Sequence, residues 1–283
     1  MNSIPKNMAP NSAQNTAQSN TQNSAYSSSK WDDVWLVIPA YNEAATIRKL
    51  AQQALELCPR VIIVDDHSSD HTIAELDGLE VVLLKNETNR GKAACLLRAF
   101  AYAEEHWARC VITLDGDGQH NPYDAEKLLS AWLHQPRHLI IGARLHDKSH
   151  FPLARYYANC VARFWISWAA GHPIADSQSG FRVYPIEAVR IALQGNATGT
   201  RFTFESELLI EAALADITTV AVAIPGHYPT NARPSHFRPV VDIVKIILMV
   251  ARKLLRQGMA PRGLINSLKT CDMFYDDKTH PHA

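Results

Sequence analysis

The sequence predicts an α/β fold with a mostly parallel central sheet flanked by helices. Short apolar runs rich in β-branched residues alternate along the chain with longer segments of helical periodicity, which indicates βαβ units. Such runs are typical of parallel strands, because helices cover both faces of a parallel sheet. The expected strands are 34–38, 60–64, 79–84, 110–114, 138–142, 181–184 and 218–224. The expected helices are 44–57, 72–76, 91–107, 125–133, 153–170, 187–193, 205–214 and 240–256.

Local signals mark where several of these elements begin and end. The first strand stops at Pro39, which has no N–H to donate to a neighbouring strand. An acidic pair follows the second strand, and Gly91 stands at the start of the helix 91–107. The run 110–114 is short, β-branched and followed by Gly116, so we expect a buried strand there.

Composition narrows the classes of protein that fit. The chain has 283 residues, 47% of them hydrophobic, and a formal net charge of zero. A general nucleic-acid binder would carry a basic excess, so we expect no nucleic-acid partner. The five cysteines are scattered without CxxC spacing, which predicts reduced thiols, no zinc site and a cytoplasmic protein. We expect no signal peptide, because the N-terminus lacks an apolar stretch, and no membrane span, because the apolar window 243–255 is interrupted by basic residues.

The chain divides into three parts by composition. Residues 1–30 are dominated by Asn, Ser, Gln, Thr and Ala, and we expect a disordered tail because such a segment buries too little apolar surface to fold. Residues 31–257 hold all the expected strands and helices and are predicted to form a single domain. Residues 258–283 are polar, and we expect a loosely ordered C-terminal tail.

One acidic motif follows the central strand, namely Asp115-Gly116-Asp117-Gly118-Gln119-His120. Its carboxylates emerge at the carboxyl end of a strand, which is where open α/β sheets bind ligands. Two neighbouring carboxylates repel each other unless a cation lies between them. Oxygen ligands of this kind suit Mg²⁺ or Mn²⁺, which also bind substrate phosphates. The alternative is an ordinary Asp-Gly turn.

Three other motifs end strands or open a helix. At 39–43, an aromatic ring beside hydrogen-bonding groups suits a nucleotide base, although an ordinary loop is an equal alternative. At 64–70, we expect Asp66 to bind a ribose or a base, and the residues after it to cap the next helix. At 89–92, the amides of a helix start and Lys92 would face an anionic ligand, with a surface loop as the alternative.

Taken in this order, PxYNE, VDDxSxD, NxGK and DGDGQH resemble the motifs of glycosyltransferase family 2, whose fold is a Rossmann-like GT-A fold. The resemblance extends from Val34 to Arg256. Within the family the chain is most similar to the dolichol- and polyprenyl-phosphate sugar transferases, because of DGDGQH and the motifs at 142–144, 176–182 and 204–209. It lacks the QxxRW motif and the transmembrane helices of processive synthases.

The resemblance implies an inverting, metal-dependent transfer of one sugar from a UDP- or GDP-sugar to a lipid phosphate. It implies metal ligation by Asp115, Asp117 and Gln119, and a catalytic set of Asp117, Asp176, Arg144 and Arg155, the two arginines meeting the acceptor phosphate. The implied nucleotide-binding residues are Pro39, Tyr41, Glu43, Asp66, Lys92, Asp115, Arg233, His236 and Arg238. His236 stands where the family often has lysine, and Arg238 would compensate for its weaker charge.

The acceptor decides whether a general base is needed. A lipid phosphate arrives as an anion, so it needs positioning by arginines more than proton removal. A hydroxyl acceptor, on a glycolipid, a small molecule or a protein, needs a base, for which Asp176 is the candidate unless it is only a turn carboxylate. We expect Arg182 to brace the loop of Asp176. A non-catalytic nucleotide-sugar-binding protein is the alternative outside enzymes.

Two helices have the composition of membrane-surface helices. Helix 153–170 carries Phe164, Trp165 and Trp168, and helix 240–256 combines an apolar face with basic residues. Core packing or a dimer face is the alternative for each helix. Peripheral membrane contact would place the protein at the cytoplasmic face of a membrane.

Overall fold

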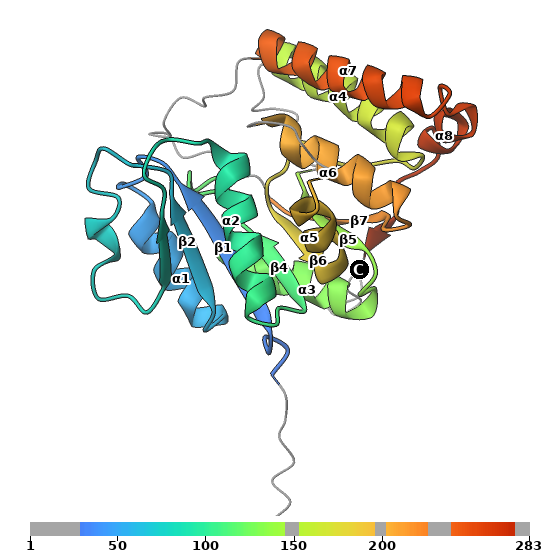
Figure 1. Cartoon of the computed structure of the whole chain (residues 1–283). Coiled ribbons are helices and arrows are strands. Elements are labelled where there is room, and N and C mark those ends of the chain that lie inside the picture. The colour runs from blue at the N-terminus through green and yellow to red at the C-terminus, as the bar shows by residue number, and fades with distance from the viewer. Residues whose placement is uncertain (1–28, 145–152, 196–201, 226–238, 275–283) are drawn as a thin grey trace, which may run out of the picture.

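The computed structural model describes residues 29–144, 153–195, 202–225 and 239–274, so the predictions for 1–28 and 275–283 lie outside it (Figure 1). An eight-stranded sheet has the order β3-β2-β1-β4-β6-β5-β7-β8. Its strands pair in parallel except where β6 pairs with β4 and β5, which confirms the mostly parallel sheet. The strands are β1 (Val34–Ala40), β2 (Val61–Asp65), β3 (Val82–Lys85), β4 (Cys110–Thr113), β5 (Leu139–Ala143), β6 (Arg182–Pro185), β7 (Thr219–Ala223) and β8 (Met273–Phe274).

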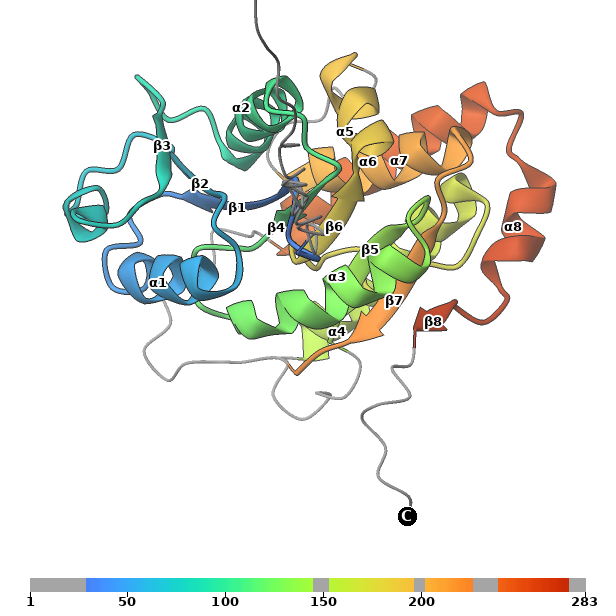
Figure 2. The same ribbon diagram turned by 90° about the horizontal axis from the view of Figure 1, so that it is seen from below.

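Helices cover both faces of the sheet, with α1 and α3 on one face and α2, α5 and α6 on the other (Figure 2). The helix expected at 72–76 is instead a short 3-10 turn, Ala74–Leu76. The helices are α1 (Ile47–Leu57), α2 (Lys92–Glu105), α3 (Ala125–His134), α4 (Leu153–Ala170), α5 (Ile186–Leu193), α6 (Phe202–Leu214), α7 (Pro239–Arg256) and α8 (Pro261–Ser267).

β1 is apolar at consecutive positions because helices cover both faces of the sheet at this strand. Trp35 and Val37 belong to the hydrophobic cluster that includes residues of α2, α5 and α6. Leu36 and Ile38 belong to the cluster on the opposite face, with α1 and α3. Successive side chains of a strand point to opposite faces, so a strand covered on both sides needs apolar residues at every position.

A further layer lies beyond α6, made of α4, α7 and α8 (Figure 1). In this layer α4 packs against α6, α7 and α8, and α7 also packs against α6. Within the described ranges, no helix combines the length and the apolar character that crossing a bilayer requires.

The prediction of a loose tail after residue 257 is wrong for the described residues 258–274. α8 packs against α4, and β8 extends the sheet beside β7. The indole Nε1 of Trp168 donates to the carbonyl oxygens of Met259 and Ala260, at 3.1 and 3.3 Å, which fixes the start of α8. Gly263 permits the close packing, because a Cβ there would lie 2.8 Å from the carbonyl oxygen of Trp168. These are tertiary contacts, which a polar local sequence does not reveal.

Candidate active site

The motifs at the carboxyl ends of β1, β2 and β4 meet at one edge of the sheet, because these three strands are neighbours and parallel. The hydroxyl of Thr46 donates to the carbonyl oxygen of Gly116 at 2.6 Å, which ties the loop after β1 to the acidic motif. A Cβ at Gly116 would lie 3.0 Å from the carbonyl oxygen of Pro39 and 3.4 Å from Cγ of Glu43. The first and fourth motifs are therefore in direct contact.

The loops after β1 and β2 hold each other through side-chain to backbone hydrogen bonds. The N–H of Ser69 donates to Oδ1 of Asn42 at 2.7 Å, and the N–H of Asn42 donates to Oγ of Ser68 at 2.9 Å. Asp70 accepts from the N–H of Thr72 at 2.9 Å, which fixes the turn. The N-cap residue of the 3-10 turn is Ile73, whose side chain makes no cap, so neither Ser69 nor Asp70 caps it as expected.

Asp66 is buried and its carboxylate accepts three hydrogen bonds from the segment that leads to α2. The donors are Nδ2 of Asn86 at 2.8 Å and the backbone N–H groups of Arg90 at 2.9 Å and Gly91 at 2.6 Å. Asp66 therefore anchors the loop that presents Lys92, and its binding of a nucleotide stays a prediction.

Lys92 lies between two carboxylates that come from distant parts of the chain. Its Nζ is 2.5 Å from Oδ1 of Asp115 and 2.9 Å from Oε2 of Glu205, which α6 supplies. Burial lowers the pKa of Lys92, but Asp115 and Glu205 outweigh it and raise that pKa above its ordinary value. Burial raises the pKa of Asp115, and Lys92 outweighs it and lowers that pKa. Both groups are therefore charged at neutral pH.

Gly180 makes room for this ion pair. A Cβ at this position would lie 2.6 Å from Nζ of Lys92 and 2.7 Å from Oδ1 of Asp115, closer than real Cβ atoms approach such groups. The backbone of the loop before β6 therefore lies against the pair, and only glycine fits without displacing it.

Asp117 has the opposite electrostatic setting from Asp115. Burial and the nearby charge of Asp115 raise its pKa above the ordinary value, and the N–H of Gln119 donates to its Oδ1 at 3.0 Å. Within the described ranges, no group of three His, Cys, Asp or Glu side chains gathers around a metal position. A carboxylate that no described cation pairs with directly, next to the amide of Gln119, nevertheless fits a divalent cation that takes its remaining ligands from phosphate oxygens and water.

His120 is buried beside the acidic motif, and its ring centroid lies 5.3 Å from that of Phe181. Burial lowers its pKa to about 4, against the opposing effect of Asp115, so the imidazole is neutral at pH 7. Its Nδ1 has no hydrogen-bond partner among the described residues.

The buried His120 is expected to make stability depend on pH. A folded-state pKa below the unfolded value gives stability that is complete above about pH 6.5 and declines as the pH falls toward the folded pKa. In metal-free protein the free energy of unfolding should fall by about 2 kcal/mol between about pH 7.5 and about pH 5 through this residue. Urea unfolding should show a flatter pH dependence for His120→Gln. The exposed control His71→Gln should keep the wild-type slope, and equal slopes for all three would contradict the assignment.

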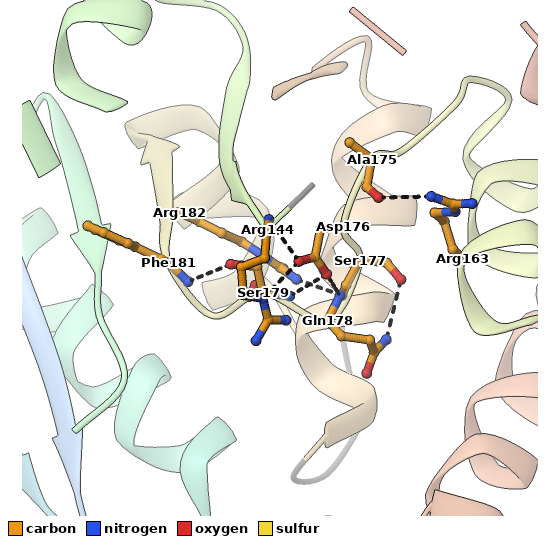
Figure 3. Close-up of polar contacts among 9 residues, drawn as sticks. All are labelled: Arg144, Arg163, Ala175, Asp176, Ser177, Gln178, Ser179, Phe181 and Arg182. Carbon is orange, nitrogen blue, oxygen red and sulfur yellow. Dashed lines mark hydrogen bonds and ion pairs between the residues drawn. The ribbon is translucent and has the colours of Figure 1, made fainter. Parts of the chain in front are cut away.

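Arg144 and Asp176 point toward each other from the end of β5 and the loop before β6 (Figure 3). Nε of Arg144 donates to Oδ2 of Asp176 at 3.0 Å, and Oδ1 accepts from the N–H groups of Gln178 and Ser179, both at 3.1 Å. Burial raises the pKa of Asp176, but Arg144 and these hydrogen bonds lower it below the ordinary value. Asp176 is thus an ionised carboxylate that already holds the loop and an arginine.

Arg182 is fully buried and braces the same loop, as the sequence predicts. Its guanidinium donates to the carbonyl oxygens of Ser177 at 2.8 Å, Ser179 at 2.7 Å and Glu205 at 3.0 Å (Figure 3 shows its place in the loop). These bonds connect the Arg144–Asp176 pair to α6 and, through Glu205, to Lys92.

The remaining predicted residues divide by whether the structure describes them. Tyr41 and Glu43 are half-buried after the end of β1. Arg155 lies in α4, but its side chain is outside the described part of the chain, as are the three predicted late-loop residues Arg233, His236 and Arg238. Glu205 and Gly180 are the additions that the structure makes. Both fall in motifs that we singled out, but no spacing rule connects either of them to Lys92.

Comparison with known proteins identifies the family of the chain. A sequence profile described as glycosyl transferase family 2 matches residues 35–179, just over half of the chain. The chain is 28% identical to the UDP-N-acetylglucosamine–dolichyl-phosphate N-acetylglucosaminyltransferase of Methanococcus voltae, over 62% of this chain and 78% of that protein. It is 25% identical to the polyprenol monophosphomannose synthase of Mycolicibacterium smegmatis, over 67% of this chain and 75% of that protein.

Solved structures share the fold. Glucosyl-3-phosphoglycerate synthase from Mycobacterium tuberculosis, crystallised with Mn²⁺, UDP and glucosyl-3-phosphoglycerate, matches with a TM-score of 0.55 and 19% identity, over 81% of this chain and 80% of that one. Mannosyl-3-phosphoglycerate synthase from Rubrobacter xylanophilus matches with a TM-score of 0.59 and 17% identity, over 81% and 75% of the two chains. These matches confirm the GT-A fold.

Proposed function

The chain belongs to glycosyl transferase family 2, and we propose that this glycosyltransferase moves one sugar from a nucleotide-sugar donor to a polyprenyl-phosphate-type lipid, with inversion and with a divalent cation. The observation that carries the proposal is the pairing of charges at the sheet edge. Lys92 neutralises Asp115, while no described cation pairs directly with the Asp117 carboxylate beside it, whose charged form is disfavoured by burial and by Asp115. Such an edge suits a donor that brings both a cation and phosphates.

The donor would lie across the ends of β1, β2 and β4. We assign the base and ribose to Pro39, Tyr41 and Glu43 after β1. Arg233, His236 and Arg238, which lie outside the described residues, would bind the diphosphate. A UDP- or GDP-sugar fits this assignment. A nucleotide-sugar donor is supported by one relative named for UDP-N-acetylglucosamine and by a solved structure of similar fold that contains UDP.

Asp117 and Gln119 would hold Mg²⁺ or Mn²⁺, with Asp115 facing the same ion. When bound, the ion supplies Lewis-acid neutralisation of the charge on the leaving nucleoside diphosphate. The protein's own contribution is to fix these ligands. Thr46 holds the backbone of Gly116, and the amide of Gln119 orients the Asp117 carboxylate.

The acceptor would lie at Arg144, with Arg155 as the second arginine. A lipid phosphate oxygen attacks the anomeric carbon from the side opposite the donor diphosphate. The new C–O bond forms as the bond to the diphosphate breaks, and the diphosphate leaves with the electron pair. No proton moves in this step, so no general base is needed.

The setting of Asp176 favours the phosphate acceptor over a hydroxyl. Its carboxylate is ionised, but both of its oxygens already accept hydrogen bonds that hold Arg144 and the loop. Taking a proton from a hydroxyl would compete with those bonds. In the proposal Asp176 therefore orients Arg144 toward the acceptor phosphate, and the enzyme works at the cytoplasmic face of a membrane.

Asp117→Asn tests the proposal. Loss of the cation ligand should lower the rate of sugar transfer by about 1000-fold, because Lewis-acid stabilisation is worth several kcal/mol. Release of nucleoside diphosphate and labelled lipid should be measured with UDP- and GDP-sugars, polyprenyl phosphate and Mn²⁺, and Mn²⁺ binding by calorimetry. The matched control is Asp77→Asn at an exposed position, which should behave as wild type. The proposal would be overturned if the wild-type enzyme transferred sugar to no lipid phosphate, or if Asp117→Asn kept full activity.

A further inference from the structure

The end of the outer helical layer has one sign of charge. Between Asp242, in the first turn of α7, and Asp272, every charged side chain is basic, and helix α4, which packs against α7 and α8, contains no acidic residue. The chain as a whole has no net charge, so this concentration is local. The basic residues of the segment are Lys245, Arg252, Lys253, Arg256, Arg262 and Lys269.

Helix α7 separates its buried side from its exposed side cleanly. At 3.6 residues per turn, its buried residues fall within about 100° of its circumference. They include Ile246, Val250 and Leu254, which belong to the core cluster that contains residues of α4 and α6. The exposed residues occupy an arc of about 120° on the opposite side. This arc, which we call the α7 outer face, consists of Val244, Lys245, Leu248, Arg252, Leu255 and Arg256.

The α7 outer face is amphipathic in itself. Val244, Leu248 and Leu255 are 49%, 55% and 69% exposed and lie within about 40° of one another. The three basic residues follow within the adjacent part of the arc. In α8 and just after it, the exposed Ile265 and Leu268 continue the apolar side chains, with Arg262 and Lys269 beside them.

The inner side of α7 carries one cation that is paired with acidic side chains and stabilises the fold. Lys253 is buried and pairs with Glu207 at 2.8 Å and also with Glu211, both on α6. In contrast, no acidic group among the described residues pairs with the basic side chains of the α7 outer face or of α8. Their charge is therefore left for something outside the described chain.

Two of the three aromatic residues that suggested a membrane contact in the sequence, Trp165 and Trp168, also have a packing role, whereas the third, Phe164, is 40% exposed. Trp165 and Trp168 are half-buried and stacked, with ring centroids 5.3 Å apart, and Trp168 donates to the start of α8. They pack the outer layer together. α4 keeps exposed apolar side chains of its own, and α7 and α8 add an amphipathic surface on the side of α6 away from α1 and α3 (Figures 1 and 2).

We propose that the α7 outer face, continued by α8, docks on the surface of a bilayer that contains anionic phospholipids. Exposed apolar side chains in line, flanked by cations that no described acidic group pairs with, are what an interfacial helix presents to lipid headgroups. A second copy of the chain would bring like charges together, which disfavours a dimer through this face. The inference deepens the proposed function and rests on it, since a lipid-phosphate acceptor is held in a bilayer.

Vesicle sedimentation of the full chain tests the charges. The triple variant Lys245→Ser, Arg252→Ser, Arg256→Ser should bind vesicles of phosphatidylcholine with phosphatidylglycerol about 100-fold more weakly than wild type. Salt at about 1 M should weaken wild-type binding in the same direction. The control removes three exposed cations from other faces, as Lys49→Ser, Lys85→Ser, Arg137→Ser, and should bind as wild type.

The apolar contribution has its own variant. Leu248→Ser, Leu255→Ser should weaken binding about tenfold, and the control Leu133→Ser, Leu214→Ser, also at exposed leucines, should not. Equal binding by wild type and both α7 variants would overturn the docking face, as would equal losses in the controls.

A second assay, sugar transfer to a short-chain, water-soluble polyprenyl phosphate without vesicles, separates the docking proposal from the proposed function. In this vesicle-free assay the α7 variants should transfer sugar at wild-type rates. If the wild-type enzyme transfers no sugar in the assay, the proposed function is overturned, whereas the vesicle-binding experiment still tests the docking face.

Discussion

Lys92→Met is expected to lower the free energy of unfolding at neutral pH by about 3–5 kcal/mol, because it leaves two inward-facing carboxylates without the cation that joins them. Asp115 and Glu205 are 28% and 10% exposed, so water replaces little of the lost interaction. Native domains are stable by only about 5–15 kcal/mol, so the loss is a large share of the total. Urea unfolding monitored by circular dichroism measures it.

The pH dependence of the deficit identifies its cause. In wild type the lowered pKa of Asp115 contributes stability above about pH 4 that is lost as the pH falls through the folded value. The raised pKa of Lys92 contributes in full below about pH 10. Without Lys92, burial favours the protonated form of Asp115, so the deficit of the variant should shrink on acidification toward about pH 4.

A matched control distinguishes this buried ion pair from surface pairs. Lys30 pairs with Glu126 at 2.7 Å, and both side chains are nearly half exposed. Lys30→Met should cost less than about 1 kcal/mol, since exposed pairs are worth little. If Lys92→Met costs no more than Lys30→Met, the ion pairs of Lys92 do not hold the sheet edge together.

The strands were predictable because a run of consecutive apolar residues indicates a strand that is buried on both faces. In 110–114 every side chain is apolar or a buried threonine, and the structure covers both faces of β4. The direction of β6 was not predictable, because an apolar run such as 181–184 reads the same in either direction. β6 is antiparallel to β4 because, after the long excursion through α4, the chain re-enters the sheet at the same edge where β4 and β5 end.

The site divides in the same way. The sequence brings Asp115 and Asp117 to a strand end through local spacing alone, and the structure confirms that the motifs after β1, β2 and β4 share an edge. Whether a carboxylate serves the ligand or the protein depends on donors distant in sequence. Asp66 accepts its hydrogen bonds from residues at least 20 positions later, so its anchoring role was not visible. Glu205 meets Lys92 only because α6 packs near α2.

Gly180→Ala is expected to weaken the binding of UDP or GDP with Mn²⁺ by about tenfold, and to lower the free energy of unfolding by about 1–3 kcal/mol. The new methyl group would overlap Lys92 and Asp115, so the pair must move away from the position where Asp115 faces the proposed donor. The expected loss in affinity corresponds to one charge-assisted hydrogen bond. Calorimetry with each nucleoside diphosphate measures the affinity, and urea unfolding measures the stability.

Gly195→Ala is the control that separates strain from displacement of the pair. Gly195 has φ of +77° with nothing within 4 Å of a Cβ, so alanine there costs about 1–2 kcal/mol through backbone strain alone. Its nucleotide affinity should remain that of wild type although the fold is destabilised to a similar degree. If both variants keep wild-type affinity, the Asp115–Lys92 pair lies outside the donor site. A loss confined to Gly180→Ala assigns the pair to donor binding, since general destabilisation would weaken both.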